Sequence, residues 1–174
     1  MININKVLRQ IIAIELEELS GDIKKELIAQ GHRLTGRLVE STEVVNDGKG
    51  VGIKMNFYIQ YVNDGVKSVN IPFTRGSGRK SSKYIDALMD YFRKRGLGPE
   101  DSKRAAFATA MKHKKEGIPT KASKRFSSTG KRTGAVDIAI KRNENKIETN
   151  IENKINEKVL ATVDLSFNQL LKAA

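Results

Sequence analysis

Side chains that could perform acid–base or metal chemistry are few and widely separated in this sequence. His32 and His113 are the two histidines, neither shares a motif with a carboxylate, and there is no cysteine. The acidic groups at 15–18 and 40–43 could resemble nuclease carboxylates, but a simpler interpretation is the solvated face of a helix and of a strand. No nucleophile elbow or HExxH motif is present. We therefore predict no catalytic residue, no metal site, no cofactor and no small-molecule substrate, so that the protein is not an enzyme.

The run GSGRKSS at 76–82 superficially resembles a phosphate-binding loop. A true P-loop needs GxxxxGK[ST] between a buried strand and a helix. Here Arg79 separates Gly78 from Lys80, and no apolar strand precedes the run. The pattern predicts a flexible basic loop that can touch an anion without enclosing it.

The charge of the chain is concentrated in one segment. The formal net charge is +12, and residues 67–134 hold eighteen basic and five acidic side chains, whereas the segments on either side are close to balanced. Such a block favours a polyanionic neighbour, either nucleic acid or an acidic protein surface. A solvated, mobile segment is the alternative interpretation.

The basic residues of this segment are the candidates for contact with a partner or with DNA. They are Arg75, Arg79, Lys80, Lys83, Arg93, Lys94, Arg95, Lys112, Lys114, Lys115, Lys124, Arg125, Lys131 and Arg132. Aromatic residues that could stack on bases are scarce among them, so we expect any nucleic-acid binding to be independent of sequence.

Apolar periodicity predicts helices at both ends of the chain. One helix spans residues 4–30, with a kink or restart favoured at Ser20-Gly21-Asp22, and ends at Gly31. The last forty residues predict a long amphipathic helix, with a break favoured near 143–145. Its apolar positions, which we expect to pack on the sheet together with the first helix, are Ile140, Ile147, Ile151, Ile155, Val159, Leu160, Val163, Phe167, Leu170 and Leu171.

Between these helices the sequence predicts a hairpin and a helical insert. The turn residues Asn46-Asp47-Gly48 centre a two-strand signal. The second arm alternates, so that Val51, Ile53, Met55 and Phe57 predict one buried face. Two helices are expected over residues 82–95 and from about residue 100 to 116, the second with an apolar stripe of Ala106, Phe107, Ala110 and Met111. Residues 117–134 are poor in apolar side chains and predict a segment that is mobile or orders on a partner.

These elements predict an α+β fold, in which a small antiparallel sheet is packed by the N-terminal and C-terminal helices and carries a basic helical insert. The length of 174 residues favours a single domain. Within it, 1–66 would form a helix plus hairpin core, 67–134 the basic loop and helical insert, and 135–174 the helical segment that completes the core. The opening residues lack an apolar run long enough for export or bilayer insertion, so we expect a soluble protein.

Three short motifs occur in a specific order: Thr35-Gly36-Arg37-Leu38, then Tyr58 to Gly65 (YIQYVNDG), then Ile71-Pro72-Phe73. This order resembles the neck or tail-completion (head–tail joining, minor tail) proteins of long-tailed bacteriophages. In that family "TGxL" joins the first helix to the first strand, so that Leu38 would dock under the hairpin. The second motif would form a helical turn that presents Tyr61 and Val62 to the core. Asn63 stands where the family often has an acidic residue, which puts the geometry of this turn in question.

The resemblance implies a structural virion protein, made in the host cytoplasm, that assembles as a homo-oligomeric ring at the head–tail neck or tail terminus. Its partners would be the connector and the tail tube, with contact to phage DNA and no membrane. The alternative from composition is a stand-alone nucleic-acid-binding protein without sequence specificity, in which the basic insert binds the phosphate backbone. An adaptor for an acidic protein is a third interpretation.

Overall fold

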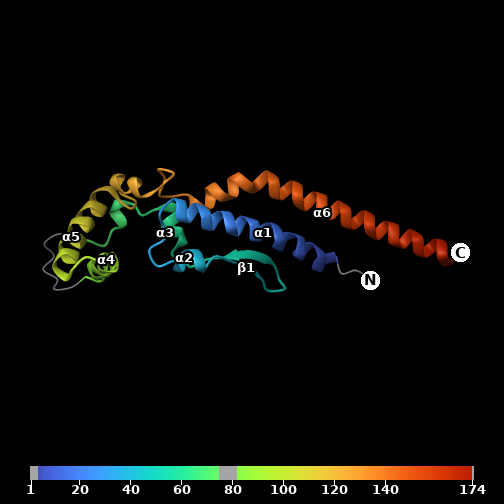
Figure 1. Ribbon diagram of the computed structural model, residues 1–174, viewed down its shortest axis with the longest axis horizontal. Coiled ribbons are helices and arrows are strands. Elements are labelled where there is room, and N and C mark those ends of the chain that lie inside the picture. The colour runs from blue at the N-terminus through green and yellow to red at the C-terminus, as the bar shows by residue number, and fades with distance from the viewer. Residues whose placement is uncertain (1–3, 75–81, 174) are drawn as a thin grey trace. The chain divides into compact units, whose positions relative to one another are not determined.

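The computed structural model describes residues 4–74 and 82–173, which form mostly α-helices and one two-stranded antiparallel sheet (Figure 1). This confirms the predicted α+β class, with helices at both ends of the chain. The chain divides into two compact units. Unit 1 combines Met1–Ile59 with Gly134–Ala174, and unit 2 is Gln60–Thr133.

The first helix of unit 1, α1, spans Ile4–Ala29 and confirms the helix predicted from its apolar spacing. It continues through Gly21, so the predicted kink at that position is wrong. Asp22 was expected to cap a second piece of helix. Its carboxylate instead accepts a hydrogen bond from Lys25 Nζ at 2.9 Å, one turn further along the same helix.

Gly31 terminates α1, as predicted from the sequence. Gly31 has φ 75°, a left-handed conformation that glycine adopts without a Cβ penalty. Its N–H bonds to Ile28 O, and the His32 N–H bonds to Leu27 O, which is the Schellman pattern of helix termination.

A short helix, α2, spans Arg37–Glu40 where the sequence predicted a simple turn into the sheet. Gly36 precedes it with φ 79°, and Leu38 is buried, as the resemblance implied. The hydroxyls of Ser41 and Thr42 both donate to the Leu38 carbonyl. These bonds end the helix and direct the chain into the first strand.

The hairpin is confirmed: β1, Glu43–Asn46, pairs antiparallel with β2, Val51–Lys54. Asp47 organises the loop, because its carboxylate accepts N–H bonds from Lys49 at 2.9 Å and Gly50 at 3.0 Å. These backbone donors hold the pKa of Asp47 below its usual value.

The prediction that the second strand of the hairpin has one buried face is wrong. The strand ends at Lys54, and Phe57 lies beyond it with 77% of its surface exposed. Val51, Gly52 and Ile53 are all half-buried, so burial does not alternate along β2. A two-stranded ribbon packed on one helix buries neither face completely.

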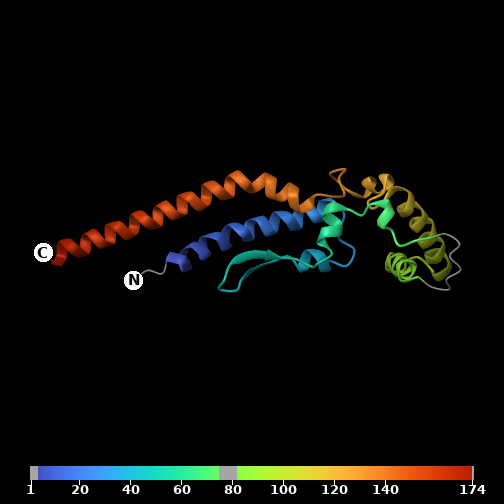
Figure 2. The ribbon, with the colours of Figure 1, turned by 180° about the vertical axis from the view of Figure 1, so that it is seen from behind.

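The C-terminal helix, α6, spans Ala135–Ala173 without the break expected near 143–145. It packs on α1, and the hairpin also packs on α1. Figures 1 and 2 show α1 lying between α6 and the hairpin. The prediction that α6 packs on the sheet is therefore wrong.

The interface between α1 and α6 is a row of polar contacts, which we call the polar ladder. Acidic residues at steps of three and four on α1 face amides and cations on α6. The pairs are Glu26 with Arg142, Asp22 with Asn143, Glu18 with Lys146, and Glu15 with both Asn150 and Lys154. Small side chains, Ala135 and Ala139, are fully buried at the start of α6 and let the two helices approach closely.

Glu15 is the most deeply buried member of the ladder, with 1% of its surface exposed. Asn150 donates to Glu15 Oε2 at 2.9 Å, and Lys154 Nζ donates to Oε1 at 2.5 Å. Burial would raise the pKa of Glu15, but these two hydrogen bonds and the charge of Lys154 together lower it below its usual value. The carboxylate is therefore ionised and compensated inside the interface.

The second half of α6 has no such contacts with the rest of the described chain. Every described side chain from 156 onward is exposed. Among them are five apolar residues that we had expected to complete the core: Val159, Leu160, Val163, Phe167 and Leu171. Leu165, which was not in the predicted set, is exposed as well.

Unit 2 begins within α3, Ile59–Asp64, the helical turn expected before Gly65. Gly65 has φ 76° and closes it. Tyr61 is 52% exposed, so the expectation that it faces the core is wrong, whereas Val62 is half-buried.

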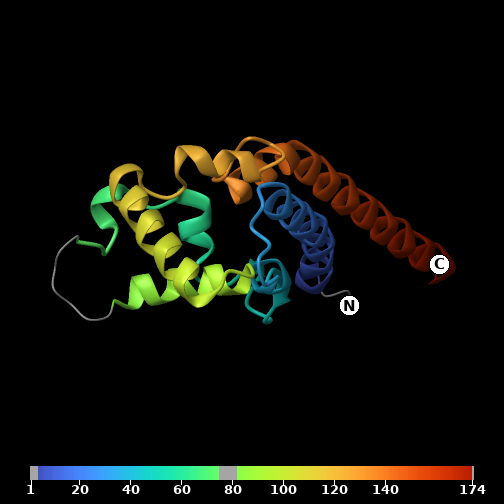
Figure 3. The same cartoon turned by 60° about the vertical axis from the view of Figure 1, so that its left-hand side comes forward.

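The helices α4 (Lys83–Lys94) and α5 (Pro99–Glu116) follow each other in sequence and pack against each other (Figure 3). They form most of unit 2 and confirm the two helices predicted for the insert. A short 3-10 helix, η1 (Ser68–Asn70), packs on α5. The core of this unit combines residues of α4 and α5 with the Ile71-Pro72-Phe73 motif. Its buried members are Ile71, Phe73, Ile85, Ala106 and Ala110.

The stripe predicted for α5 is confirmed in part. Ala106 and Ala110 are fully buried and allow close approach, but Phe107 and Met111 remain exposed. The ring of Phe107 meets Phe73 edge to face, with centroids 6.4 Å apart. One large side chain of the stripe thus lies at the rim of the core.

The two ends of the helical insert are tied together by a backbone bridge. Val66 and Ile118 exchange both N–H bonds, at 2.7 and 2.8 Å. Gly65 and Gly117 flank the bridge with positive φ, and a Cβ on either would lie within 2.6 Å of a carbonyl oxygen of the opposite strand. Only glycine fits such an approach.

The segment 117–134, which composition predicted to be mobile, has defined local structure. It contains a 3-10 helix, η2, at Lys121–Phe126. Glu116 accepts the Lys121 N–H at 2.9 Å at the start of this helix. Hydrogen bonds such as this one hold the segment, together with the packing of Ile118 on the core of unit 2. Apolar content alone does not predict such hydrogen bonds.

We expect the Lys154→Met substitution to lower the free energy of unfolding by about 1–3 kcal/mol, because it leaves a buried carboxylate without its cation. Lys146→Met is the matched control. Its partner Glu18 is 54% exposed, so solvent screens the pair and the loss should be smaller than for Lys154→Met. Urea unfolding followed by circular dichroism measures both. Equal losses would contradict a ladder in which the buried Glu15 contacts contribute most.

Candidate polyanion-binding surface

The whole net charge of the chain belongs to unit 2. Between Gln60 and Thr133 the sequence holds eighteen basic and six acidic side chains, whereas unit 1 holds fourteen of each. Unit 1 pairs many of its charges in the polar ladder. Unit 2 therefore carries the cations that are available for a polyanion.

Four side chains of unit 2 form a row of alternating aromatic rings and guanidinium groups, which we call the arginine–aromatic cluster: Tyr91, Arg95, Phe126 and Arg125. Arg95 Cζ lies 5.0 Å from the centroid of the Tyr91 ring and 5.9 Å from that of Phe126. Arg125 Cζ lies 4.8 Å from the centroid of Phe126. All three distances are within the range of a cation–π interaction.

Two elements far apart in sequence position this cluster. Tyr91 and Arg95 are one turn apart at the end of α4 and so share a face of the helix. Arg125 and Phe126 end η2. Tyr91 also packs edge to face against Phe92, which contacts the core, so the row is anchored at one end.

A third guanidinium lies next to the cluster. Burial lowers the pKa of Arg132, and the positive charge of Arg95 adds to this effect, while Tyr91 acts in the opposite direction. Arginine keeps its proton at neutral pH in any such setting. Arg132 therefore keeps its positive charge, and the charge of Arg95 acts on it.

The structure brings together part of the predicted contact set. Arg95 and Arg125 meet at the cluster. Lys83, Arg93, Lys112, Lys115, Lys124 and Lys131 are exposed elsewhere on unit 2. Arg75, Arg79 and Lys80, with most of the run at 76–82, lie outside the described residues.

Two other predicted contact residues have partners within the unit. Lys94 Nζ lies 2.5 Å from Asp90 on the same helix. Lys114 Nζ donates to the Ile71 carbonyl at 3.0 Å and so ties α5 to the core segment. These two lysines are less available to a partner than the arginines of the cluster.

Sequence reasoning missed the aromatic members of this surface. Tyr91 and Arg95 have the i, i+4 spacing of a cation–π pair on a helix, and Arg125 and Phe126 are adjacent. These two local signals could be found in the sequence. The contact between α4 and η2 could not be predicted from it, because that contact depends on tertiary packing.

The acidic groups considered as nuclease carboxylates have structural partners. Glu15 and Glu18 belong to the polar ladder, and Glu43 lies 3.4 Å from Lys54 across the hairpin. Within residues 4–74 and 82–173, no group of three or more His, Cys, Asp or Glu side chains could hold a metal ion.

His113, which the sequence placed among lysines, is paired with Tyr84 across the α4–α5 interface. Tyr84 Oη lies 2.6 Å from His113 Nδ1. Burial lowers the pKa of His113, against a smaller opposing effect of Glu116, and burial raises the pKa of Tyr84. Both shifts favour the neutral forms of the pair at physiological pH.

The chain matches no protein family model, no curated protein and no solved structure at a significant level of similarity. No helix within the described part of the chain has the length and apolar character needed to cross a membrane.

The His113 pair predicts a pH dependence of stability. Because the folded-state pKa is lowered, the unfolded chain binds more protons as pH falls below about 6.5, and the stability present above that pH is progressively lost. We expect the stability difference between the wild type and His113→Gln to shrink from pH 7.5 to pH 5. Thermal unfolding at each pH measures this difference. A pH-independent difference would contradict the prediction.

Proposed function

We propose that this protein is a structural subunit of a tailed-bacteriophage virion that assembles as a ring at the head–tail neck or tail terminus. Support comes first from the order of the three motifs between Thr35 and Phe73. The order of elements agrees with what the resemblance implies: a helix, a hairpin, a short helix closed by Gly65, a helical insert and a C-terminal helix.

The observation that carries the proposal is the exposed apolar end of α6. The helix is thirteen residues longer than α1, or about 20 Å. Along this end, apolar residues recur four apart and so neighbour one another on the helix surface, namely Val159, Val163, Phe167 and Leu171. A contiguous apolar surface of this kind marks an interaction site in soluble proteins.

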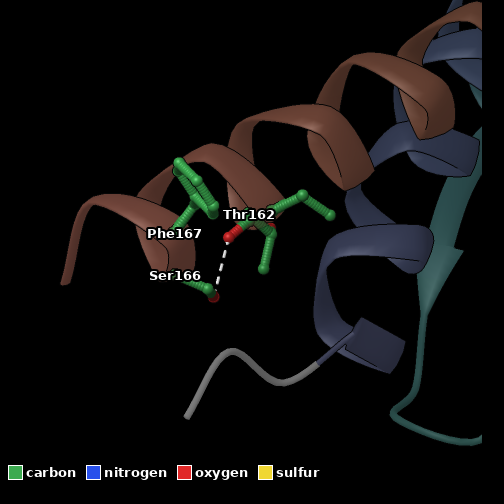
Figure 4. A pocket seen from close by; sticks show the side chains of 4 residues that line it. Thr162, Ser166 and Phe167 are labelled. Carbon is green, nitrogen blue, oxygen red and sulfur yellow. Dashed lines mark hydrogen bonds between the residues drawn. The ribbon is translucent and has the colours of Figure 1, made fainter. Parts of the chain in front are cut away.

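The geometry of this helix end fits contact with another protein rather than capture of a small molecule. A shallow depression there is lined by Thr162, Val163, Ser166 and Phe167, all from α6. In Figure 4 the Ser166 hydroxyl bonds back to the Thr162 carbonyl, and the ring of Phe167 stands away from α1. One helix face cannot enclose a ligand, but it can enter a groove on a neighbour.

In a ring, the end of α6 would contact the adjacent subunit or the next component of the virion. A head-to-tail interface repeats until the rotation closes, so each subunit needs two different surfaces. The neutral unit 1 would supply these contacts. The cationic unit 2 would face a polyanion, which is either DNA in the conduit or an acidic neighbour.

A second candidate function is stand-alone binding of nucleic acid without sequence specificity. The arginine–aromatic cluster is the observation that favours it. This function would not require the apolar end of α6 to be covered, which separates it from the first candidate.

We expect the double substitution Val163→Lys with Phe167→Lys to abolish ring assembly, because two charges would have to be buried at the contact. Ala161→Lys with Asn168→Lys adds the same charge at exposed positions seven residues apart, on another part of the helix, and should assemble normally. Light scattering and electron microscopy would follow each protein, alone and mixed with connector and tail-tube proteins. Equal assembly of both variants, or a wild type that stays monomeric in every mixture, would overturn the proposal.

A further inference from the structure

We infer that the arginine–aromatic cluster is a binding site for the phosphodiester backbone of nucleic acid. The argument rests on the geometry of unit 2 and does not depend on assembly through α6. It identifies the partner class of the cationic unit and the residues that contact it.

The cluster offers hydrogen-bond donors that the described chain does not neutralise. Across residues 4–74 and 82–173, neither Arg95 nor Arg125 forms an ion pair with a carboxylate. Each guanidinium lies against an aromatic ring, and a cation–π contact does not use the N–H groups as hydrogen-bond donors to a carboxylate. A guanidinium edge presents two parallel N–H donors, the pattern that phosphate oxygens accept.

The aromatic rings make the site preorganised. A free arginine loses side-chain freedom when it binds, and this loss reduces affinity. Phe126 contacts both Arg95 and Arg125, and Tyr91 contacts Arg95 from the other end of the row. Much of the ordering is therefore already present before a ligand arrives.

Closely spaced cations favour a ligand with closely repeated anions. Arg95 and Arg125 both lie against the ring of Phe126. A nucleic-acid strand places one phosphate at every nucleotide, and the exposed Lys124 next to Arg125 extends the positive surface. An acidic protein segment offers separate, flexible carboxylates instead. Phe126 is 53% exposed, so part of an aromatic ring is also open at the site.

The test measures binding of the full chain to a fluorescently labelled single strand and to its duplex, by anisotropy, over a series of salt concentrations. We expect Arg95→Gln with Arg125→Gln to weaken binding at least about tenfold and to make the slope of log K against log salt shallower by about 1.5–2, as expected for two lost phosphate contacts. Lys103→Gln with Arg104→Gln removes the same charge from exposed positions on α5. This control should retain the wild-type slope.

A second variant separates geometry from charge. Arg95→Lys with Arg125→Lys keeps both charges but loses the paired donors and the stacking on the rings. We expect binding several-fold weaker than wild type with little change in slope. This variant also keeps the test decisive if the glutamine variant fails to fold, which a circular dichroism melt would reveal.

Three results would overturn the inference. One is equal weakening by the cluster and control glutamine variants, which would indicate diffuse charge attraction. Another is a lysine variant that binds as well as the wild type. The third is competition by poly-aspartate as effective as that by unlabelled nucleic acid, which would point to an acidic protein partner. None of these outcomes changes the light-scattering result expected for α6, so this inference and the proposed function can fail separately.

Discussion

The polar ladder between α1 and α6 is the interaction on which unit 1 depends. Glu15 is its most deeply buried member, with Asn150 and Lys154 supplying the hydrogen bonds and the charge that keep it ionised. Removing a carboxylate from water is unfavourable unless its partners are well placed, so this contact fixes the register of the two helices. It also uses polar residues of α6 for internal packing. The apolar residues further along the helix are consequently left on the surface.

The distribution of charge along the chain explains why the surfaces of the two units differ. Unit 1 balances its acidic and basic side chains and pairs several of them across helices. Unit 2 holds the net charge of +12 and stacks arginines on aromatic rings instead of pairing them with carboxylates. One unit therefore offers an apolar contact surface and the other a cationic one. This division of surfaces is what a subunit placed between proteins and a polyanion requires, and it supports the proposed role.

Much of the secondary structure could be predicted from the sequence, and much of the packing could not. Helical spacing located α1, α4, α5 and α6, and Asn46-Asp47-Gly48 located the hairpin, because these signals are local. The apolar positions of α6 predicted packing on the sheet, yet Ala139, Asn143 and Asn150 lie toward α1. Periodicity identifies an amphipathic helix but does not say which partner covers its apolar residues, and a polar interface gives no apolar signal. The arginine–aromatic cluster was missed for the related reason that it joins two elements about thirty residues apart.

The most direct test of the account is amide hydrogen exchange along α6 in the isolated protein and in the assembled particle. A helix held only by the polar ladder should show slow exchange over residues 139–154 and fast exchange over 159–171 in the isolated protein, with protection spreading into 159–171 on assembly. Uniform slow exchange along the whole of α6 in the isolated protein would contradict it, as would fast exchange at 139–154.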